Sequence, residues 1–221
     1  LREIDEIVER DADLPSIQEF KVITVADALT ARREFDKAAK DLIQFYKENT
    51  QSKHLSLIKG RIIRNLAEDI RSAVDRGDFI QGLRFYSRDQ STWLKGNKRA
   101  DLAFLAGRAY ETAGVFSEAK SNYLETLHRL ESQKLEDRDV FEPVIAKESV
   151  RLRLAASAAA TKDFAGAESL LKQIKDTGKL SNHEQVERAG LAADVAEARG
   201  QTDQARRYLA EVIQAFGAKK V

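Results

Sequence analysis

One short pattern recurs five times along the 221-residue chain and limits what the chain can fold into. Its clearest copy has an aromatic residue, a small residue three positions later and a large residue four positions further on: Phe116, Ala119 and Tyr123. The other copies are Phe35-Ala38-Leu42, Phe79-Gly82-Tyr86, Phe164-Ala167-Leu171 and Thr202-Ala205-Leu209. Residues three and four apart share one face of a helix, and internal repetition is typical of stacked helical arrays. The pattern therefore predicts repeated helices.

A second helical pattern precedes each copy. We call the first residue of each copy its leading residue. Nine positions before the five leading residues stand, in chain order, Ala26, Ile70, Gly107, Ala155 and Ala193. Four of these are small, which allows two helices to approach closely. Between the two patterns, Gly77, Gly114 and Gly200 can take the left-handed conformation that ends a helix. The repeating unit is therefore predicted to be a pair of antiparallel helices joined by a tight turn.

Composition supports an all-α fold, because good helix formers dominate and there are only two prolines. We expect a short helix over residues 1–10 and a helix over 140–161 in which Pro143 stands near the start. The expected helix pairs are 16–32 with 35–49, 54–76 with 79–89, 98–113 with 117–134, 140–161 with 164–176, and 182–199 with 202–216.

The chain resembles the tetratricopeptide repeat (TPR) superfamily through Gly107-x-x-Tyr110 followed by Gly114, Phe116, Ala119 and Tyr123. The resemblance is best over residues 100–129. It implies a TPR-like α-solenoid of about five antiparallel helix pairs in a right-handed superhelical array. The whole chain would then be one repeat domain, with repeats near 16–50, 54–90, 98–134, 140–176 and 182–217. The leading residues are spaced 44, 37, 48 and 38 apart, longer than the family's period of about 34, so some helices or connections must be longer.

Residues that carry chemistry are scarce. The chain has no cysteine, which removes disulfides, thiolate nucleophiles and sulfur metal ligands. Its three histidines, His54, His128 and His183, lie far apart without convincing partners for a metal. Neither a Gly-x-Ser-x-Gly elbow nor a glycine-rich phosphate loop occurs. We therefore expect no catalytic, cofactor-binding or metal-ligating residues, and no enzyme activity.

The charges nearly balance, with 37 basic and 36 acidic residues, so no global field attracts nucleic acid or membrane. Residues 51–100 are locally basic, with eleven Lys or Arg against five Asp or Glu. Aromatic residues such as Trp93 accompany these basic residues, so binding of an anion or a nucleic acid by the segment 53–99 is an alternative function. We favour the interpretation that these arginines lie on a solvated helix face. The stripe of core residues around Ile62, Ile63 and Leu66 occupies one side of the helix, so the arginines are left on the side that faces solvent.

A partner surface follows from the resemblance, because in this family the concave face is lined mostly by the first helix of each pair. The positions carried over are Phe20, Ile23, Asp27, Arg64, Ala67, Arg71, Asp101, Phe104, Arg108, Leu152, Ala156, Ala159, Glu187, Asp194 and Glu197. We expect partner binding at Arg64, Arg71, Phe104, Arg108, Leu152, Ala156 and Ala159. The arginines suit an acidic partner, and the small apolar residues suit a bulky side chain of an extended peptide or amphipathic helix. Alternatively, Ala156 and Ala159 are buried by the neighbouring hairpin.

The resulting functional prediction is a non-catalytic protein–protein interaction scaffold or adaptor in a larger bacterial assembly, envelope- or motility-associated. The alternative is self-association, through residues 1–10 or the last helix at 202–216. No run of 18 apolar residues occurs, so no membrane span is expected within the chain. The chain begins at Leu1 and contains no methionine, from which we expect a trimmed or processed product. A periplasmic or membrane-tethered location with an upstream anchor is favoured over a cytoplasmic one.

Overall fold

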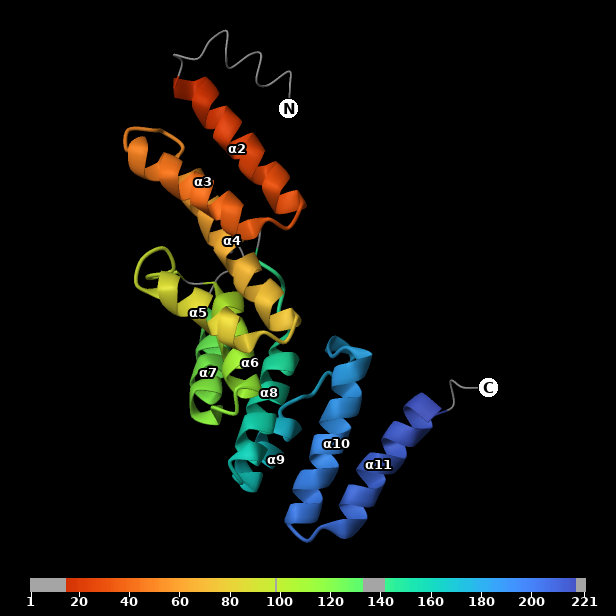
Figure 1. The fold of residues 1–221 in the computed structure, drawn as a ribbon. Coiled ribbons are helices and arrows are strands. Elements are labelled where there is room, and N and C mark those ends of the chain that lie inside the picture. The colour runs from red at the N-terminus through yellow and green to blue at the C-terminus, as the bar shows by residue number, and fades with distance from the viewer. Residues whose placement is uncertain (1–14, 98, 133–141, 218–221) are drawn as a thin grey trace. The chain divides into compact units, whose positions relative to one another are not determined.

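The structure is a computed structural model that describes residues 15–97, 99–132 and 142–217. In these ranges the regular secondary structure is helical throughout, without a strand. The chain divides into two compact units, of which the first holds residues up to Asn97 and the second begins at Lys98. Each unit is a stack of antiparallel helix pairs. The prediction of an all-α fold built from five pairs is confirmed (Figure 1).

The first unit contains the pairs α2 (Pro15–Ala31) with α3 (Phe35–Glu48) and α4 (Leu55–Asp75) with α5 (Phe79–Gln90). Each helix packs against the next along the chain, so α3 lies between α2 and α4. Fully buried residues from three helices form the core, namely Ala26, Ala38, Leu42, Ile58, Ile62 and Ala73. Trp93, in the turn after α5, lies edge-on to Tyr46 with ring centroids 5.2 Å apart.

The second unit contains three pairs. They are α6 (Ala100–Thr112) with α7 (Phe116–Ser132), α8 (Lys147–Ala160) with α9 (Phe164–Lys172), and α10 (Asn182–Ala198) with α11 (Thr202–Gly217); a short 3₁₀ helix, η2 (Thr177–Lys179), precedes α10. The first helix of each later pair packs on the pair before it, α8 on α7 and α10 on both α8 and α9. This is the stacking that a repeated hairpin requires, because one helix pair cannot bury its apolar faces alone.

The five turns within the pairs share one backbone conformation. In each, the residue two positions before the second helix has a positive φ; these residues are Arg33, Gly77, Gly114, Lys162 and Gly200. In the third pair, Gly114 N donates to Glu111 O (3.0 Å) and Val115 N donates to Tyr110 O (2.9 Å). The same two bonds recur in the other four turns, and together they form the Schellman motif that satisfies carbonyls at a helix C-terminus. The repeat is therefore present in the backbone as well as in the sequence.

Gly107 marks the closest helix approach that the sequence predicts. A Cβ built on Gly107 would lie 2.6 Å from Cε1 and 2.7 Å from Cδ1 of Tyr123. Tyr123 is fully buried on α7 and packs in one cluster with Ala100, Ala119, Val150 and Leu154. The small residue on the first helix thus makes room for the ring of the second helix.

The predicted start of the fourth pair is wrong. We expected a helix over 140–161 near Pro143, but α8 begins at Lys147, and the described residues 142–146 are not helical. The reason is a long-range cap: a carboxylate oxygen of Glu142 accepts hydrogen bonds from the backbone N of Ala100 (2.5 Å) and Asp101 (3.4 Å). These are donors that the first turn of α6 leaves without helical partners. The helix predicted over residues 1–10 lies outside the described residues.

Candidate protein-interaction surface

An arginine of α8 joins the first helices of all three pairs in the second unit. The Arg153 guanidinium lies 3.3 Å from a carboxylate oxygen of Glu111 on α6 and forms a second ion pair with Glu187 on α10. Its side chain is only 12% exposed. Breaking such a pair by removing one partner leaves an uncompensated, mostly buried charge. Arg153 therefore fixes how α6, α8 and α10 lie beside one another.

Burial and charge shape the titration of this cluster. The Tyr123 hydroxyl donates to the Glu111 carboxylate. Burial, followed by the charge and the hydrogen bond of Glu111, raises the pKa of Tyr123 well above its usual range, so its hydroxyl stays protonated and donates. Burial lowers the pKa of Arg153, but the hydrogen bond to Glu187 and the charge of Glu111 outweigh it and raise the pKa overall.

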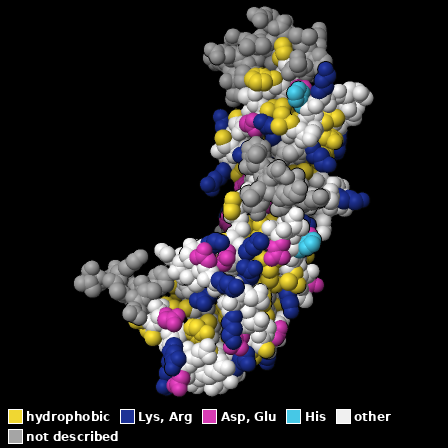
Figure 2. Space-filling view, turned by 180° about the vertical axis from the view of Figure 1, so that it is seen from behind, with side chains coloured by type: hydrophobic (Ala, Val, Ile, Leu, Met, Phe, Trp, Pro, Cys, Tyr) yellow, Lys and Arg dark blue, Asp and Glu magenta, His cyan; other side chains and the backbone are white. Residues whose placement is uncertain are grey.

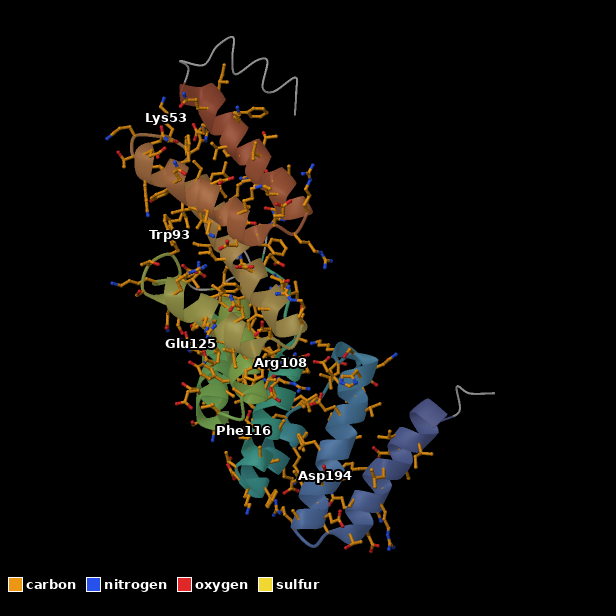
Figure 3. All side chains as sticks on the ribbon, viewed as in Figure 1. Lys53, Trp93, Arg108, Phe116, Glu125 and Asp194 are labelled. Atoms are coloured by element: carbon orange, nitrogen blue, oxygen red, sulfur yellow. The ribbon has the colours of Figure 1, made fainter. Side chains whose placement is uncertain are left out.

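Phe104 and Arg108, predicted to bind a partner, lie one turn apart on α6 beside this cluster. Phe104 is half-buried, and its ring centroid is 5.7 Å from that of Tyr123. Arg108 is exposed, one turn before Glu111. Figure 3 labels Arg108 on α6 and Asp194 on α10, both first helices, whereas Phe116 and Glu125 lie on α7. The structure thus places an exposed cation next to half-buried aromatic surface on a braced helix.

The prediction for α8 is partly wrong. Leu152 is fully buried in a core cluster with Ala155, Ala167 and Leu171, so its side chain offers no surface to a partner. Ala156 and Ala159 are half-buried, and Ala159 packs against the same cluster. The reason is that α8 packs against three neighbouring helices, α7, α9 and α10. The alternative, that the neighbouring hairpin buries Ala156 and Ala159, does not hold in full, since both are half-buried, whereas Leu152 is the residue that is fully buried.

Two further positions expected on the concave face are also buried. Ala67 is fully buried in α4, and Asp101 is fully buried at the start of α6. Asp101 forms a two-fold hydrogen-bonded ion pair with Arg99, at 3.0 and 2.9 Å. These positions hold the array together internally.

In the first unit, polar contacts join the first helices in the same way. Asp27 of α2 accepts two hydrogen bonds from Arg61 of α4, at 3.1 and 3.0 Å. One turn further on, the Thr30 hydroxyl lies 2.8 Å from the Asn65 side-chain oxygen. The predicted residues Arg64 and Arg71 lie on α4 and are half-buried, and Arg71 is 3.4 Å from Glu68.

Several arginines of the basic segment 53–99 are paired with carboxylates within the fold. Besides the pairs of Arg61 and Arg71, Arg88 contacts Asp89 (2.7 Å) and Asp36 (3.7 Å). On the face drawn in Figure 2, coloured basic and acidic side chains are interspersed without a large area of one sign. Anion binding through this segment stays a prediction, and the ion pairs do not favour it.

The ionisable groups of the Arg153 cluster are engaged with one another. Across the described ranges, no group of three His, Asp or Glu side chains is placed to hold a metal ion. The hydrogen bond from Tyr123 and the ion pair with Arg153 engage the Glu111 carboxylate in structural contacts. None of the helices in the described part of the chain is both long and apolar enough to cross a membrane.

Sequence reasoning missed the bridges between first helices. A signal for them exists, because Asp27 and Arg61 are separated by 34 residues, as are Arg153 and Glu187. Opposite charges at that spacing would have located the bridges, since 34 residues is the period of this kind of repeat. The leading residues of the second helices are spaced 44, 37, 48 and 38 residues apart, and this irregular spacing conceals the period of 34.

The helix pairs resemble tetratricopeptide repeats in three features. The pairs are antiparallel and share one turn conformation, a small residue of one helix meets a large residue of the other, and first helices contact one another across one repeat. No family model and no curated protein matches the chain. Among solved structures, it is similar to the TPR-like repeats of a Podosopora anserina protein assigned as a kinesin light chain, at 17% identity and a TM-score of 0.45, over 94% of this chain and 98% of that one. A variant of that protein gives 17% identity and a TM-score of 0.44, over 91% and 95%.

Proposed function

We propose that the chain is a non-catalytic scaffold that binds a segment of another protein on the first helices of its second unit. The observation that carries the proposal is the Arg153 bridge, which holds α6, α8 and α10 together while Arg108 stays exposed beside it. Binding to a surface that is already ordered avoids much of the entropy cost of association. Stacked hairpins use such surfaces to dock partners.

The side chains indicate the chemistry of the partner segment. Arg108 can form a charge-assisted, two-point hydrogen bond with a carboxylate. The half-buried ring of Phe104 and the half-buried Ala156 offer apolar surface. An exposed ion pair contributes only about 0.2–1 kcal/mol, so affinity requires apolar contacts as well. The segment expected is therefore an extended peptide or amphipathic helix that combines acidic and apolar side chains. A place in a larger bacterial assembly is the biological setting we propose.

The proposal is tested by capture with a matched pair of charge reversals. The tagged chain, its Arg108→Glu variant and its Lys120→Glu variant are immobilised and exposed to extract of the source organism. Both substituted residues are exposed, but Lys120 lies on α7, a second helix. A discrete protein captured by the unsubstituted chain and by Lys120→Glu, but lost with Arg108→Glu, is expected. Circular dichroism checks that both variants are folded. Equal capture by all three chains contradicts the proposal.

A further inference from the structure

The outer face of the last helix exposes residues that the repeat buries elsewhere. Leu209 occupies on α11 the position that Leu42, Tyr123 and Leu171 occupy on α3, α7 and α9. Those three are at most 6% exposed, whereas Leu209 is 49% exposed. Ile213, one turn further along, is 70% exposed. The difference follows from stacking, because α3, α7 and α9 are each covered by the next first helix and α11 is the last helix described.

The first helix pair has the complementary feature, an open groove between α2 and α3. A cavity of 290 Å³ is lined by Lys21, Val22, Val25, Asp41, Gln44, Phe45 and Glu48. A second cavity of 610 Å³ shares Phe45 and Glu48 with it and extends to the loop at 49–54. At 100° per residue, Val25 lies on the side of α2 opposite Asp27, which faces α4. The groove is therefore on the side of this hairpin that a preceding repeat would cover.

The apolar pattern of α2 points the same way. Its apolar residues are distributed around the whole helix, including Phe20, Val22, Ile23 and Val25. A helix that is apolar all round is normally buried on more than one side. Yet Phe20 is 62% exposed and Val22 and Val25 are only half-buried. The helix therefore presents more apolar surface than α3 alone covers.

We infer that α11 of one copy docks into the α2–α3 groove of a second copy, so that copies associate head to tail. Leu209 and Ile213 would enter the groove beside Val25 and Phe45, as a second helix packs on the next first helix within each unit. Charge also favours the contact. Exposed Asp41 and Glu48 border the groove with one basic residue, Lys21. Arg206 lies one turn before Leu209 on α11, with its side chain 78% exposed and its guanidinium 4.0 Å from the Asp203 carboxylate.

The two surfaces in this contact are different, so the association is heterologous: it closes into a ring when the rotation between copies allows, and otherwise adds copies into an open chain. In either case each contact uses one α11 and one α2–α3 groove. The mass in solution should therefore rise with concentration above that of a single copy. This contact is independent of the partner surface on α6, and the two proposals can fail separately.

Two end-specific variants test the inference by sedimentation velocity over a wide concentration range. Leu209→Glu with Ile213→Glu removes the α11 stripe, and Val25→Glu removes the groove. Each variant alone should remain monomeric, because one of the two required surfaces is lost. An equimolar mixture of the two should form a dimer and no larger species, since only one intact groove and one intact α11 are available per pair.

A matched control separates surface from fold. Leu124→Glu on α7 replaces a leucine that is 50% exposed, close to the 49% of Leu209, and should leave the association of the unsubstituted chain unchanged. Arg206→Glu should weaken assembly, and adding Asp41→Lys in the same chain should restore it.

Three results overturn the inference. The first is an unsubstituted chain that stays monomeric at every concentration. The second is a Val25→Glu variant that still dimerises, which would indicate α11 pairing with α11. The third is a mixture of the two end variants that remains monomeric while the unsubstituted chain assembles. Melting curves of both variants establish that each is folded under the conditions of the experiment.

Discussion

Replacing Gly107 with alanine tests the packing that defines the repeat. In an open helix interior this change is stabilising by about 1 kcal/mol, because alanine has the higher helix propensity. At position 107, however, the new Cβ would lie 2.6 Å from Cε1 of Tyr123, a ring that is fully buried. Overpacking a core in this way costs about 1–3 kcal/mol. We therefore expect a net loss of up to about 2 kcal/mol in the free energy of unfolding.

Gly190 supplies the matched control. It also lies inside a helix, α10, but a Cβ built there meets no atom within 4 Å. Gly190→Ala should therefore raise stability by about 1 kcal/mol. Since 1 kcal/mol shifts Tm by about 2–4 °C in a chain of this size, the two variants should melt on opposite sides of the unsubstituted chain in thermal denaturation followed by circular dichroism.

The compensating change is present in the chain itself. Repeats that carry alanine at the position of Gly107 carry leucine at the position of Tyr123, as in Ala26 with Leu42 and Ala155 with Leu171. Gly107→Ala combined with Tyr123→Leu should therefore be more stable than the sum of the single effects predicts. If Gly107→Ala is stabilising, or if the double-mutant cycle shows no coupling, the packing argument is refuted.

Two further predictions concern the turns and the buried carboxylates. Lys162 has a positive φ of 64° at the turn position that three other repeats fill with glycine. Lys162→Gly should therefore raise the free energy of unfolding, measured by urea denaturation, by about 1 kcal/mol. A loss of stability would contradict the turn assignment. Burial and the charge of Asp36 raise the pKa of Asp69. The ionised Asp69 carboxylate therefore destabilises the fold at neutral pH. This destabilisation decreases as the pH falls through the folded-state pKa and disappears below the unfolded-state pKa. Asp69→Asn should therefore raise the urea midpoint at neutral pH, with the gain shrinking in acid; a gain of equal size at both pH values would falsify this.

The sequence predicted those parts of the fold that depend on residues close together in the chain. The second helices begin where the leading residue stands in each repeat, at Phe35, Phe79, Phe116, Phe164 and Thr202. Two of the turns, RREF and TKDF, lack glycine, yet Arg33 and Lys162 take the left-handed conformation there. The bonds of the Schellman motif and the packing of the following aromatic residue impose that conformation despite its cost.

The errors concern contacts between residues far apart in the chain. The start of α8 was misplaced because Glu142 caps α6 from 42 residues away, which no local pattern reveals. Leu152 was placed on the partner surface by carrying over a regular repeat. It is buried because neighbouring hairpins cover α8. Phe104 is half-buried and Arg108 is exposed, in the repeat at 100–129 that follows the regular pattern most closely, and partner binding by these two residues stays a prediction.

The most direct test of the proposed scaffold is site-specific photo-crosslinking in cells of the source organism. A photoreactive residue is placed at position 108 on α6, or at position 125 on α7, which Figure 3 shows on a different helix of the same pair. The account predicts a discrete covalent adduct with another protein from position 108, and none from position 125. Adducts of equal yield from both positions, or none from position 108, would contradict a partner surface on the first helices.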